Sequence, residues 1–145
     1  MTGSERPAPS AAEAPLVDAL GQMSFTVMAI LSRVAAANDL SLTQLRALAI
    51  LRDREPRMAE LAEHLGLDRS TVSGLIDRAA KRDLVSRIAS DTDKRSARVA
   101  LSAAGRRLAD AISGEIALVV GELTAGLSAA ERRQLTGLLE RTLRA

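Results

Sequence analysis

The 145-residue chain contains no cysteine, and this absence excludes several kinds of chemistry at once. Without cysteine there are no disulfides, no thiolate zinc sites, no cysteine nucleophile and no thiol that senses oxidants. His64 is the only histidine, so a histidine-rich metal site is excluded as well. The chain also has no glycine-rich phosphate loop, and no recognisable catalytic group is left. We therefore expect no enzyme, no cofactor and no metal site.

Aromatic residues are almost absent, since Phe25 is the only one and the chain has no tryptophan or tyrosine. Proteins that bind single-stranded nucleic acid usually stack the bases on aromatic rings, so this mode of binding is disfavoured. The same shortage weakens the case for a pocket that stacks flat aromatic ligands. Phe25 itself can be explained as a core residue.

Long apolar runs are missing too. The strongest runs, residues 27–31 and 116–120, are too short to span a membrane. The first 15 residues hold three of the four prolines and lack the apolar segment of a signal peptide. We interpret residues 1–14 as a flexible tail and expect a cytoplasmic protein with no membrane partner.

What the chain does contain is an uneven distribution of charge. The formal net charge is only +2, yet residues 69–98 hold eight basic residues and only four acidic ones. A basic middle between near-neutral flanks indicates a polyanionic partner. A solvated charged surface explains the same pattern equally well.

Apolar periodicity and capping residues predict a mainly α fold with a small β-hairpin. The expected elements are a helix over residues 15–37, a second helix between Ser41 and Pro56, helices over about 58–65 and about 69–82, a hairpin over about 84–101, and two last helices that begin at Ser102 and Ser128. The run over residues 116–120 has no polar face, so something must cover it on every side. We expect a partner subunit there, although the chain's own helices are the alternative.

Residues 58–78 have the spacing of a helix-turn-helix. Ala62 is the small residue where two helices touch, Gly66 lies in the turn, and Val72 and Leu75 pack the second helix back onto the first. Small polar residues then face outward at the start of the second helix, which is narrow enough to enter the major groove of DNA. The strand, basic hairpin and strand that follow indicate a winged helix.

At this point the chain resembles the MarR family of bacterial transcription regulators. The matching stretches are LAEHLGLDRSTVSGLIDRAAKRDLVSR and DKRSARVALSAAG. The resemblance implies a homodimer built from the helices at residues 15–37 and 102–145. It implies that residues 38–101 form a winged helix-turn-helix DNA-binding domain that reads pseudo-palindromic duplex DNA. It also implies that small organic ligands release many members from DNA. We expect a repressor, although the residues alone leave activation open.

The recognition helix supplies most candidate DNA contacts. Ser70, Thr71 and Ser73 are assigned to base edges or nearby phosphates. The basic candidates for backbone phosphates are Arg69, Arg78, Lys81 and, at the start of the third helix, Arg57. Gly74 stands where the family usually has a basic or polar side chain. Either the backbone approaches the groove closely there, or direct readout is thin and specificity depends on the wing and on DNA shape.

The wing supplies the remaining contacts. Arg95 at its tip is predicted to enter the minor groove, with Asp93 orienting it by a charge-assisted hydrogen bond. Lys94 and Arg98 are predicted to neutralise phosphates. The alternative for Asp93 and Arg95 is that they only pin the turn.

Three further polar positions have less defined roles. Asp77 faces outward and is expected to pair with Lys81, four residues later on the same helix. Arg33 and Arg46 are candidates for holding the carboxylate of an effector, though arginines on helices are usually surface residues. His64 is interpreted as a solvated surface residue. A winged helix that serves as an architectural DNA binder or as a protein-interaction module, without an effector, is the alternative function.

Overall fold

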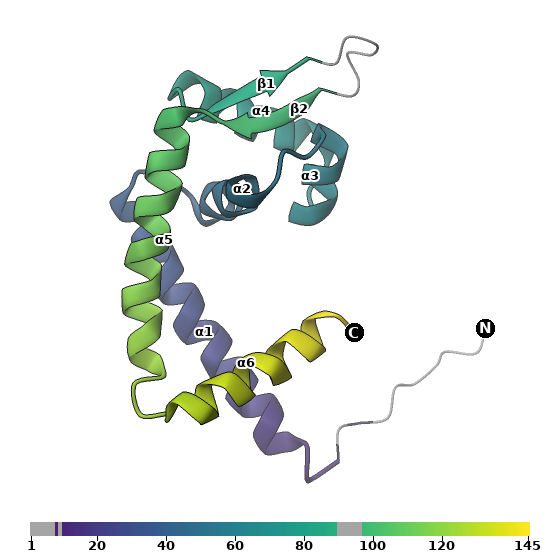
Figure 1. Cartoon of the computed structure of the whole chain (residues 1–145). Coiled ribbons are helices and arrows are strands. Elements are labelled where there is room, and N and C mark those ends of the chain that lie inside the picture. The colour runs from purple at the N-terminus through teal and green to yellow at the C-terminus, as the bar shows by residue number, and fades with distance from the viewer. Residues whose placement is uncertain (1–7, 9, 90–96) are drawn as a thin grey trace, which may run out of the picture.

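A computed structural model gives the structure of the chain and describes residue 8, residues 10–89 and residues 97–145. Over these residues the chain forms six helices and one two-stranded sheet (Figure 1). The elements in chain order are α1 (Ala14–Ala37), α2 (Leu42–Asp53), α3 (Met58–Leu65), α4 (Arg69–Lys81), β1 (Val85–Ile88), β2 (Arg98–Leu101), α5 (Ala103–Leu123) and α6 (Ala129–Leu143). The predicted fold class, mainly α with a small hairpin, is confirmed.

Side-chain caps fix where four of the helices begin. Ser41, Asp68, Ser102 and Ser128 each accept a hydrogen bond from the backbone N–H three residues later. These N–H groups have no partner inside the first helical turn, so each cap stabilises its helix by about 1 kcal/mol. The predicted starts of α2, α4, α5 and α6 are therefore confirmed.

Left-handed residues end three helices. Gly66 ends α3 at φ 66°, as predicted, whereas Asp39 and Asp83 follow α1 and α4 at φ 55° and 57°. For a residue with a side chain this conformation costs roughly 1–2 kcal/mol. The guanidinium of Arg82 donates to the carbonyl oxygens of Asp39, at 2.8 Å, and Asn38, at 3.2 Å. The turn after α1 is therefore tied to the end of α4.

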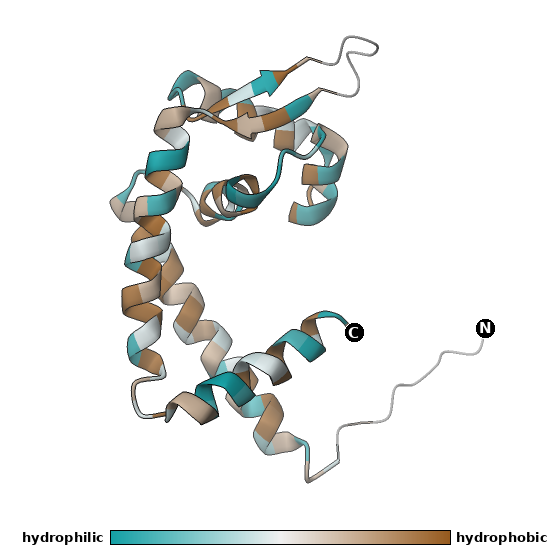
Figure 2. Cartoon of the chain, in the orientation of Figure 1, coloured by the Kyte–Doolittle hydropathy of each residue, from teal (hydrophilic) through white to brown (hydrophobic). Residues whose placement is uncertain are grey.

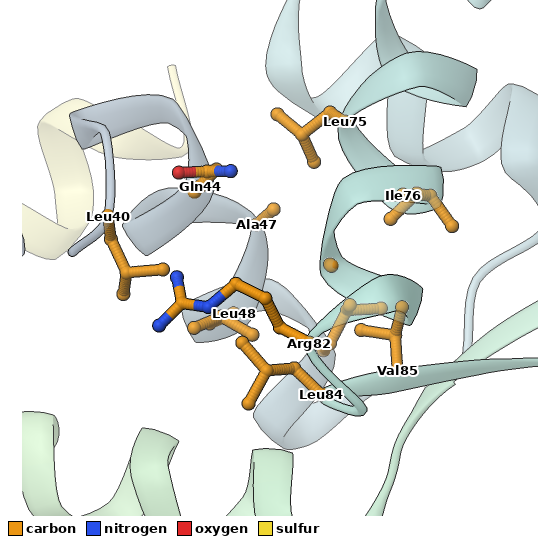
Figure 3. A pocket seen from close by; sticks show the side chains of 11 residues that line it. Leu40, Gln44, Ala47, Leu48, Leu75, Ile76, Arg82, Leu84 and Val85 are labelled. Atoms are coloured by element: carbon orange, nitrogen blue, oxygen red, sulfur yellow. The ribbon is translucent and has the colours of Figure 1, made fainter. Parts of the chain in front are cut away.

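A single apolar core holds α2, α3, α4 and the hairpin together. The core residues are Ala47, Leu51, Leu61, Ala62, Leu65, Val72, Leu75, Ile76, Ala79, Leu84, Val85 and Val99. Figure 3 shows side chains from α2 and α4 converging with Leu84 and Val85, and Arg82 and Gln44 lie at the rim. The cavity between them is about 10 Å³, room for about one water molecule. We call this well-packed unit, residues 40–101, the winged-helix lobe.

The base of the hairpin gains a third strand-like segment. β1 and β2 pair antiparallel, and Arg57 forms an isolated bridge with Arg98 on the outer side of β2. The backbone N–H of Val99 donates to the carbonyl oxygen of Pro56 at 2.9 Å. No sequence pattern indicated this contact, because proline lacks an N–H and breaks strand patterns. Its carbonyl oxygen is enough to anchor the hairpin beside the start of α3.

A second core joins the lobe to α1 and α5. Its buried residues are Ile30, Val34, Ala35, Leu40, Leu45, Leu48 and Ile112. From there α1 and α5 run side by side away from the lobe (Figure 1). Gly105, near the start of α5, lies so close to the Leu84 carbonyl that a Cβ atom would sit 1.9 Å from its oxygen. The first turn of α5 and the start of the hairpin are therefore in direct backbone contact.

The outer parts of the terminal helices are largely uncovered. No residue of α6 is buried, and its leucines are exposed. Leu118, in the apolar run of α5, is 75% exposed, and Phe25 on α1 is 78% exposed. Figure 2 shows the apolar segments of these helices at the end far from the lobe. The explanation of Phe25 as a core residue is therefore wrong for a single chain.

The length and composition of α1 bear on the expected absence of a membrane span. Among the described residues, α1 is the one helix long and apolar enough, by these two criteria, to cross a membrane. The continuous apolar runs of the sequence are short, whereas in α1 the apolar residues are spread over 24 positions. One such helix is weak evidence for a span. Ile30, Val34 and Ala35, near the end of α1, are buried in a protein core.

Candidate nucleic-acid interface

The two helices α3 and α4 form the predicted helix-turn-helix. Leu61 and Ala62 of α3 are buried, and so are Val72 and Leu75 of α4. Gly66 adopts the left-handed turn between them. Each residue therefore takes the packing role that its spacing indicated, and the opposite face of α4 is left to solvent.

That outward face carries the predicted recognition residues. Arg69, Ser70 and Thr71 are exposed in the first turn, and Ser73 is half-buried. Arg69, Ser70 and Ser73 line one open hollow between α4 and the hairpin, together with Met58, Arg87 and Ala97. Arg78 and Lys81 are exposed on the last turns of α4. The fold thus gathers the hydroxyl groups near the wing and places two basic side chains further along the helix.

Asp68 organises the first turn of α4. Its Oδ1 accepts from the Thr71 backbone N–H at 2.7 Å and from the Ser70 hydroxyl at 2.8 Å. These hydrogen bonds, the one from the Thr71 N–H above all, lower the pKa of Asp68. The carboxylate is therefore ionised at neutral pH.

Arg87 links the hairpin to the recognition helix. From β1, its Nη2 donates to Asp77 Oδ1 at 2.7 Å and to Ser73 Oγ at 3.4 Å. The expected pair of Asp77 with Lys81 is therefore wrong. Helical spacing predicts partners on the same helix only, whereas the folded hairpin brings Arg87 of β1 to the outward face of α4. Arg87 was missed as a site residue, although it ends the first stretch that carries the family resemblance and is exposed on β1.

The base of the wing carries two of the predicted phosphate contacts. Arg57 Nε donates to Glu60 Oε1 at 2.6 Å, and this hydrogen bond raises the pKa of Arg57 and lowers that of Glu60. Arg98, bridged to Arg57, donates through Nη1 to the carbonyl oxygen of Glu55 at 3.0 Å. The structure therefore brings Arg57 and Arg98 side by side, with Glu60 offsetting part of their charge.

Gly74 lies beneath the Arg78 side chain. A Cβ atom at position 74 would meet Arg78 Nη1 at 3.4 Å, which is an ordinary contact. Packing inside the chain therefore does not require glycine here. The guanidinium of Arg78 extends back over the position where the family pattern has a longer side chain.

The predicted tip of the wing falls outside the described residues. Asp93, Lys94 and Arg95 all belong to this stretch. Their assignments to the minor groove and to phosphates stay predictions.

The two arginines considered for an effector are not brought together. Arg33 is exposed on α1, and the guanidinium of Arg46 donates to the carbonyl oxygen of His64 at 2.9 Å. His64 is exposed, as expected. Arg46 lines an open hollow together with Arg54 and His64. A separate hollow of about 200 Å³ lies between α2 and α5 and contains Arg52.

Arg52 is held at that hollow by two polar partners from α5. Its Nε donates to Asp110 Oδ1 at 3.0 Å, and its Nη1 donates to Ser113 Oγ at 2.7 Å. Arg52 was missed as a site residue because its partners are about 60 positions away in the chain. Most of the remaining lining is aliphatic, and Asp53 also lines the hollow, so it offers an apolar wall with one guanidinium and one carboxylate beside it.

The fold and this face together define a winged helix-turn-helix, a class of DNA-binding fold. The family model described as MarR family matches residues 38–96. The transcriptional repressor NicR of Pseudomonas putida is 32% identical over 117 residues, which cover 79% of this chain and 73% of that protein. The chain belongs to the MarR family of transcriptional regulators.

Solved structures agree on the fold. A MarR family protein from Bacillus stearothermophilus has a TM-score of 0.83 at 19% identity, with 95% of this chain and 97% of that chain covered. A MarR family regulator from Silicibacter pomeroyi has a TM-score of 0.75 at 26% identity, with 94% of both chains covered. A point mutant of MepR from S. aureus, a structure with a bound oligodeoxyribonucleotide, has a TM-score of 0.63 at 20% identity and covers 89% of this chain and 96% of its own.

Proposed function

We propose that this protein is a cytoplasmic transcriptional repressor that binds a pseudo-palindromic DNA operator as a homodimer. The observation that carries the proposal is the outward face of α4, where exposed hydroxyl and basic side chains lie beside the base of a wing. The helix is capped and held from behind by the core of the lobe, so it presents this face as a rigid unit. The similarity to the repressor NicR favours repression over activation.

The polar residues divide between bases and phosphates. Ser70, Thr71 and Ser73 lie on the first turns of α4, which are the turns that contact base edges when a helix of this kind enters the major groove. The cations that we assign to phosphates are Arg69, Arg78, Lys81, Arg57 and Arg98. We retain the predicted minor-groove contact of Arg95, with Asp93 and Lys94 beside it.

A homodimer accounts for the uncovered terminal helices. The exposed large apolar side chains include Leu16, Leu20, Met23, Phe25 and Met28 of α1, Leu118 of α5, and Leu135, Leu138, Leu139 and Leu143 of α6. Exposed apolar surface of this extent is unfavourable in water and marks an interaction site. A second copy brings the same helices against these, and its lobe supplies the second half-site contact.

We place the effector, a small organic anion, in the hollow between α2 and α5. Its carboxylate would compete with Asp110 for the guanidinium of Arg52, while the aliphatic wall covers its apolar part. α2 belongs to the lobe, and α5 extends from the lobe to the proposed dimer interface. A ligand bound between these two helices would therefore change the orientation of the lobe relative to that interface. Release from DNA follows when the two lobes no longer match the two half-sites.

The test is duplex binding measured by fluorescence anisotropy at two salt concentrations. The native upstream DNA is compared with a scrambled duplex of equal length. We expect a preference of about 10³-fold or more for the native duplex, with one dimer per site. Equal and salt-sensitive binding to both would instead indicate the architectural function, and no binding to either would indicate a protein partner.

Two arginine variants provide a matched comparison. Arg78→Gln on α4 should weaken binding to all duplexes and reduce the slope of log affinity against log salt by about one. Arg141→Gln, also at an exposed helix position but outside α4, should leave both unchanged, with sedimentation velocity confirming that the variant keeps the oligomeric state of wild type. Equal effects of the two variants would contradict the assignment of α4 to DNA.

A further inference from the structure

The hydroxyl proton of Ser70 already has a partner inside the protein. Ser70 Oγ lies 2.8 Å from Asp68 Oδ1. An ionised carboxylate can only accept hydrogen bonds, so the serine must be the donor in this pair. Asp68 is ionised at neutral pH, and the hydrogen bond from the Thr71 N–H lowers its pKa further. What Ser70 has left for a ligand is its oxygen lone pairs.

Ser73 accepts a hydrogen bond inside the protein, whereas Ser70 donates one. Arg87 Nη2 lies 3.4 Å from Ser73 Oγ, a long and therefore weak hydrogen bond. A guanidinium can only donate, so Ser73 must be the acceptor. Its own hydroxyl proton stays available to a ligand. The orientation of Arg87 is fixed by the shorter bond to Asp77, at 2.7 Å.

A serine hydroxyl normally reads either a donor or an acceptor and is therefore a poor reader of sequence. We infer that the two serines of α4 read the major groove with opposite polarity, Ser70 as an acceptor from a base amino group and Ser73 as a donor to a base acceptor. The amino groups are N6 of adenine and N4 of cytosine; the acceptors are purine N7, guanine O6 and thymine O4. This inference rests on the proposed function, because both serines must face the operator.

The arrangement has a consequence for phosphates as well. A phosphate oxygen offers no proton, so Ser70 has nothing to give it while its own proton is bound to Asp68. Ser70 is thereby assigned to a base edge rather than to the backbone. The two serines are three positions apart on one helix face and line the same hollow. They therefore face neighbouring base pairs.

The experiment uses the full-length protein and an operator selected from random duplexes. Each adenine is replaced in turn by 2-aminopurine, which moves the amino group to the minor groove. In a second series each purine is replaced by its 7-deaza analogue, which removes N7. The operator is chosen to have an adenine-rich half-site. Where the contacted base is a cytosine, 2-pyrimidinone replaces it and removes the N4 amino group. Both series are measured with wild type, Ser70→Ala and Ser73→Ala.

We expect one position where loss of the amino group weakens wild-type binding by about 10-fold and leaves Ser70→Ala unaffected. We expect a neighbouring position where loss of the N7, O6 or O4 acceptor weakens wild type by about 5-fold and leaves Ser73→Ala unaffected. The effect is smaller because the 3.4 Å hydrogen bond from Arg87 orients Ser73 less firmly than the 2.8 Å hydrogen bond to Asp68 orients Ser70. To remove guanine O6, 2-aminopurine replaces guanine. To remove thymine O4, a 2-pyrimidinone analogue replaces thymine.

A second variant tests Asp68 as the positioning residue. Asp68→Asn keeps an oxygen for the cap, but its amide group also donates, so the polarity of Ser70 is no longer forced. We expect normal helix content by circular dichroism and at least an approximately 3-fold smaller penalty for loss of the amino group. An unchanged penalty would contradict the role of the carboxylate.

Three results would overturn the inference. The Ser70→Ala variant could lose its sensitivity to 7-deazapurines and keep its sensitivity to removal of the base amino group. Ser70 would then be a donor to the base and not an acceptor. The variant could weaken specific and scrambled duplexes equally, which would make Ser70 a phosphate contact. It could also leave binding unchanged. A wild-type protein with no preference among duplexes would instead overturn the proposed function, so the two failures are distinguishable.

Discussion

The winged-helix lobe and the outer terminal helices treat apolar residues in opposite ways. In the lobe, Leu61, Val72, Ile76 and Val99 are 0% exposed and share one core. In α6 no residue is buried, and Leu143 is 83% exposed. The lobe therefore buries its apolar residues within its own chain, whereas the terminal helices leave theirs exposed, and in the proposed homodimer a second copy covers them. DNA reading and assembly should accordingly be separable in this molecule.

The largest effect is expected from emptying the lobe core. Leu61→Ala should lower the free energy of unfolding by about 2–5 kcal/mol, because the truncated side chain leaves a cavity that its neighbours cannot fill. Denaturant unfolding at several protein concentrations measures this. The loss should be the same at each concentration, since Leu61 contacts only its own chain. A loss below about 1 kcal/mol would mean that the lobe core is less rigid than its burial indicates.

A charge on the terminal helices should act on assembly instead. Leu118→Glu places a carboxylate in the proposed interface, and we expect the dissociation constant of the dimer to rise by about 100-fold or more, about 3 kcal/mol. Sedimentation velocity over a dilution series checks this. Ile88→Glu makes the same change at an exposed apolar residue of the hairpin and should leave the dimer intact. A stable dimer in Leu118→Glu would place the interface elsewhere.

Two glycines of α5 differ in the space around their Cβ positions, and this difference allows a matched test. A side chain at Gly105 would collide with the Leu84 carbonyl, so Gly105→Ala should cost about 1–3 kcal/mol of stability. Gly114 has nothing within 4 Å of the Cβ position, so Gly114→Ala should stabilise by up to about 1 kcal/mol through helix propensity. Thermal unfolding of the pair provides the comparison, and equal shifts would contradict the close approach.

The same cap occurs once in each region, which allows a smaller test. Ser41→Ala removes the cap of α2 in the lobe and should cost about 1 kcal/mol in global unfolding. Ser128→Ala removes the matching cap of α6. There we expect faster amide hydrogen exchange confined to α6, because that helix has no buried residue in its own chain. Exchange that rises throughout the lobe in Ser128→Ala would show the two regions to be one cooperative unit.

The smallest effect is a pH dependence from Asp68. Its pKa lies below its ordinary value of 3.8 in the folded chain, so near that pH the unfolded chain binds more protons. The stabilisation is fully present above the ordinary value and is lost as the pH falls through the lowered one. Denaturant unfolding from about pH 5 to about pH 2 measures the slope. Asp68→Asn, which keeps a capping oxygen, should show a shallower slope than wild type.

The two regions also show which contacts could be predicted from sequence. Ser41, Gly66 and Asp68 were predicted correctly because a cap or a turn depends on residues a few positions apart. The pair of Asp77 with Arg87 and the pair of Arg52 with Asp110 were missed. Those contacts exist only after the hairpin and α5 have packed, so no local spacing indicates them.

The uncovered helices were predicted for a related reason. An apolar run with no polar side must be covered by something, and the exposed Leu118 is consistent with that reasoning. The exposure of Phe25 was not foreseen, because one aromatic residue in a chain forms no periodic pattern. The roles of individual DNA contacts depend on the DNA itself and stay predictions.

Arg82 makes the turn between α1 and α2 relevant to the distance between the two recognition helices of the proposed dimer. Its two hydrogen bonds to the Asn38 and Asp39 carbonyl oxygens lock the end of α4 to the end of α1. In the proposed dimer, α1 runs from the interface to this turn, and the hydrogen bonds of Arg82 connect the turn to α4. The separation of the two recognition helices would therefore depend on a turn that contacts no base. Half-sites one helical turn apart are separated by about 34 Å. A change at Arg82 would therefore alter which spacing of half-sites is bound, while the preferred bases within each half-site stay the same.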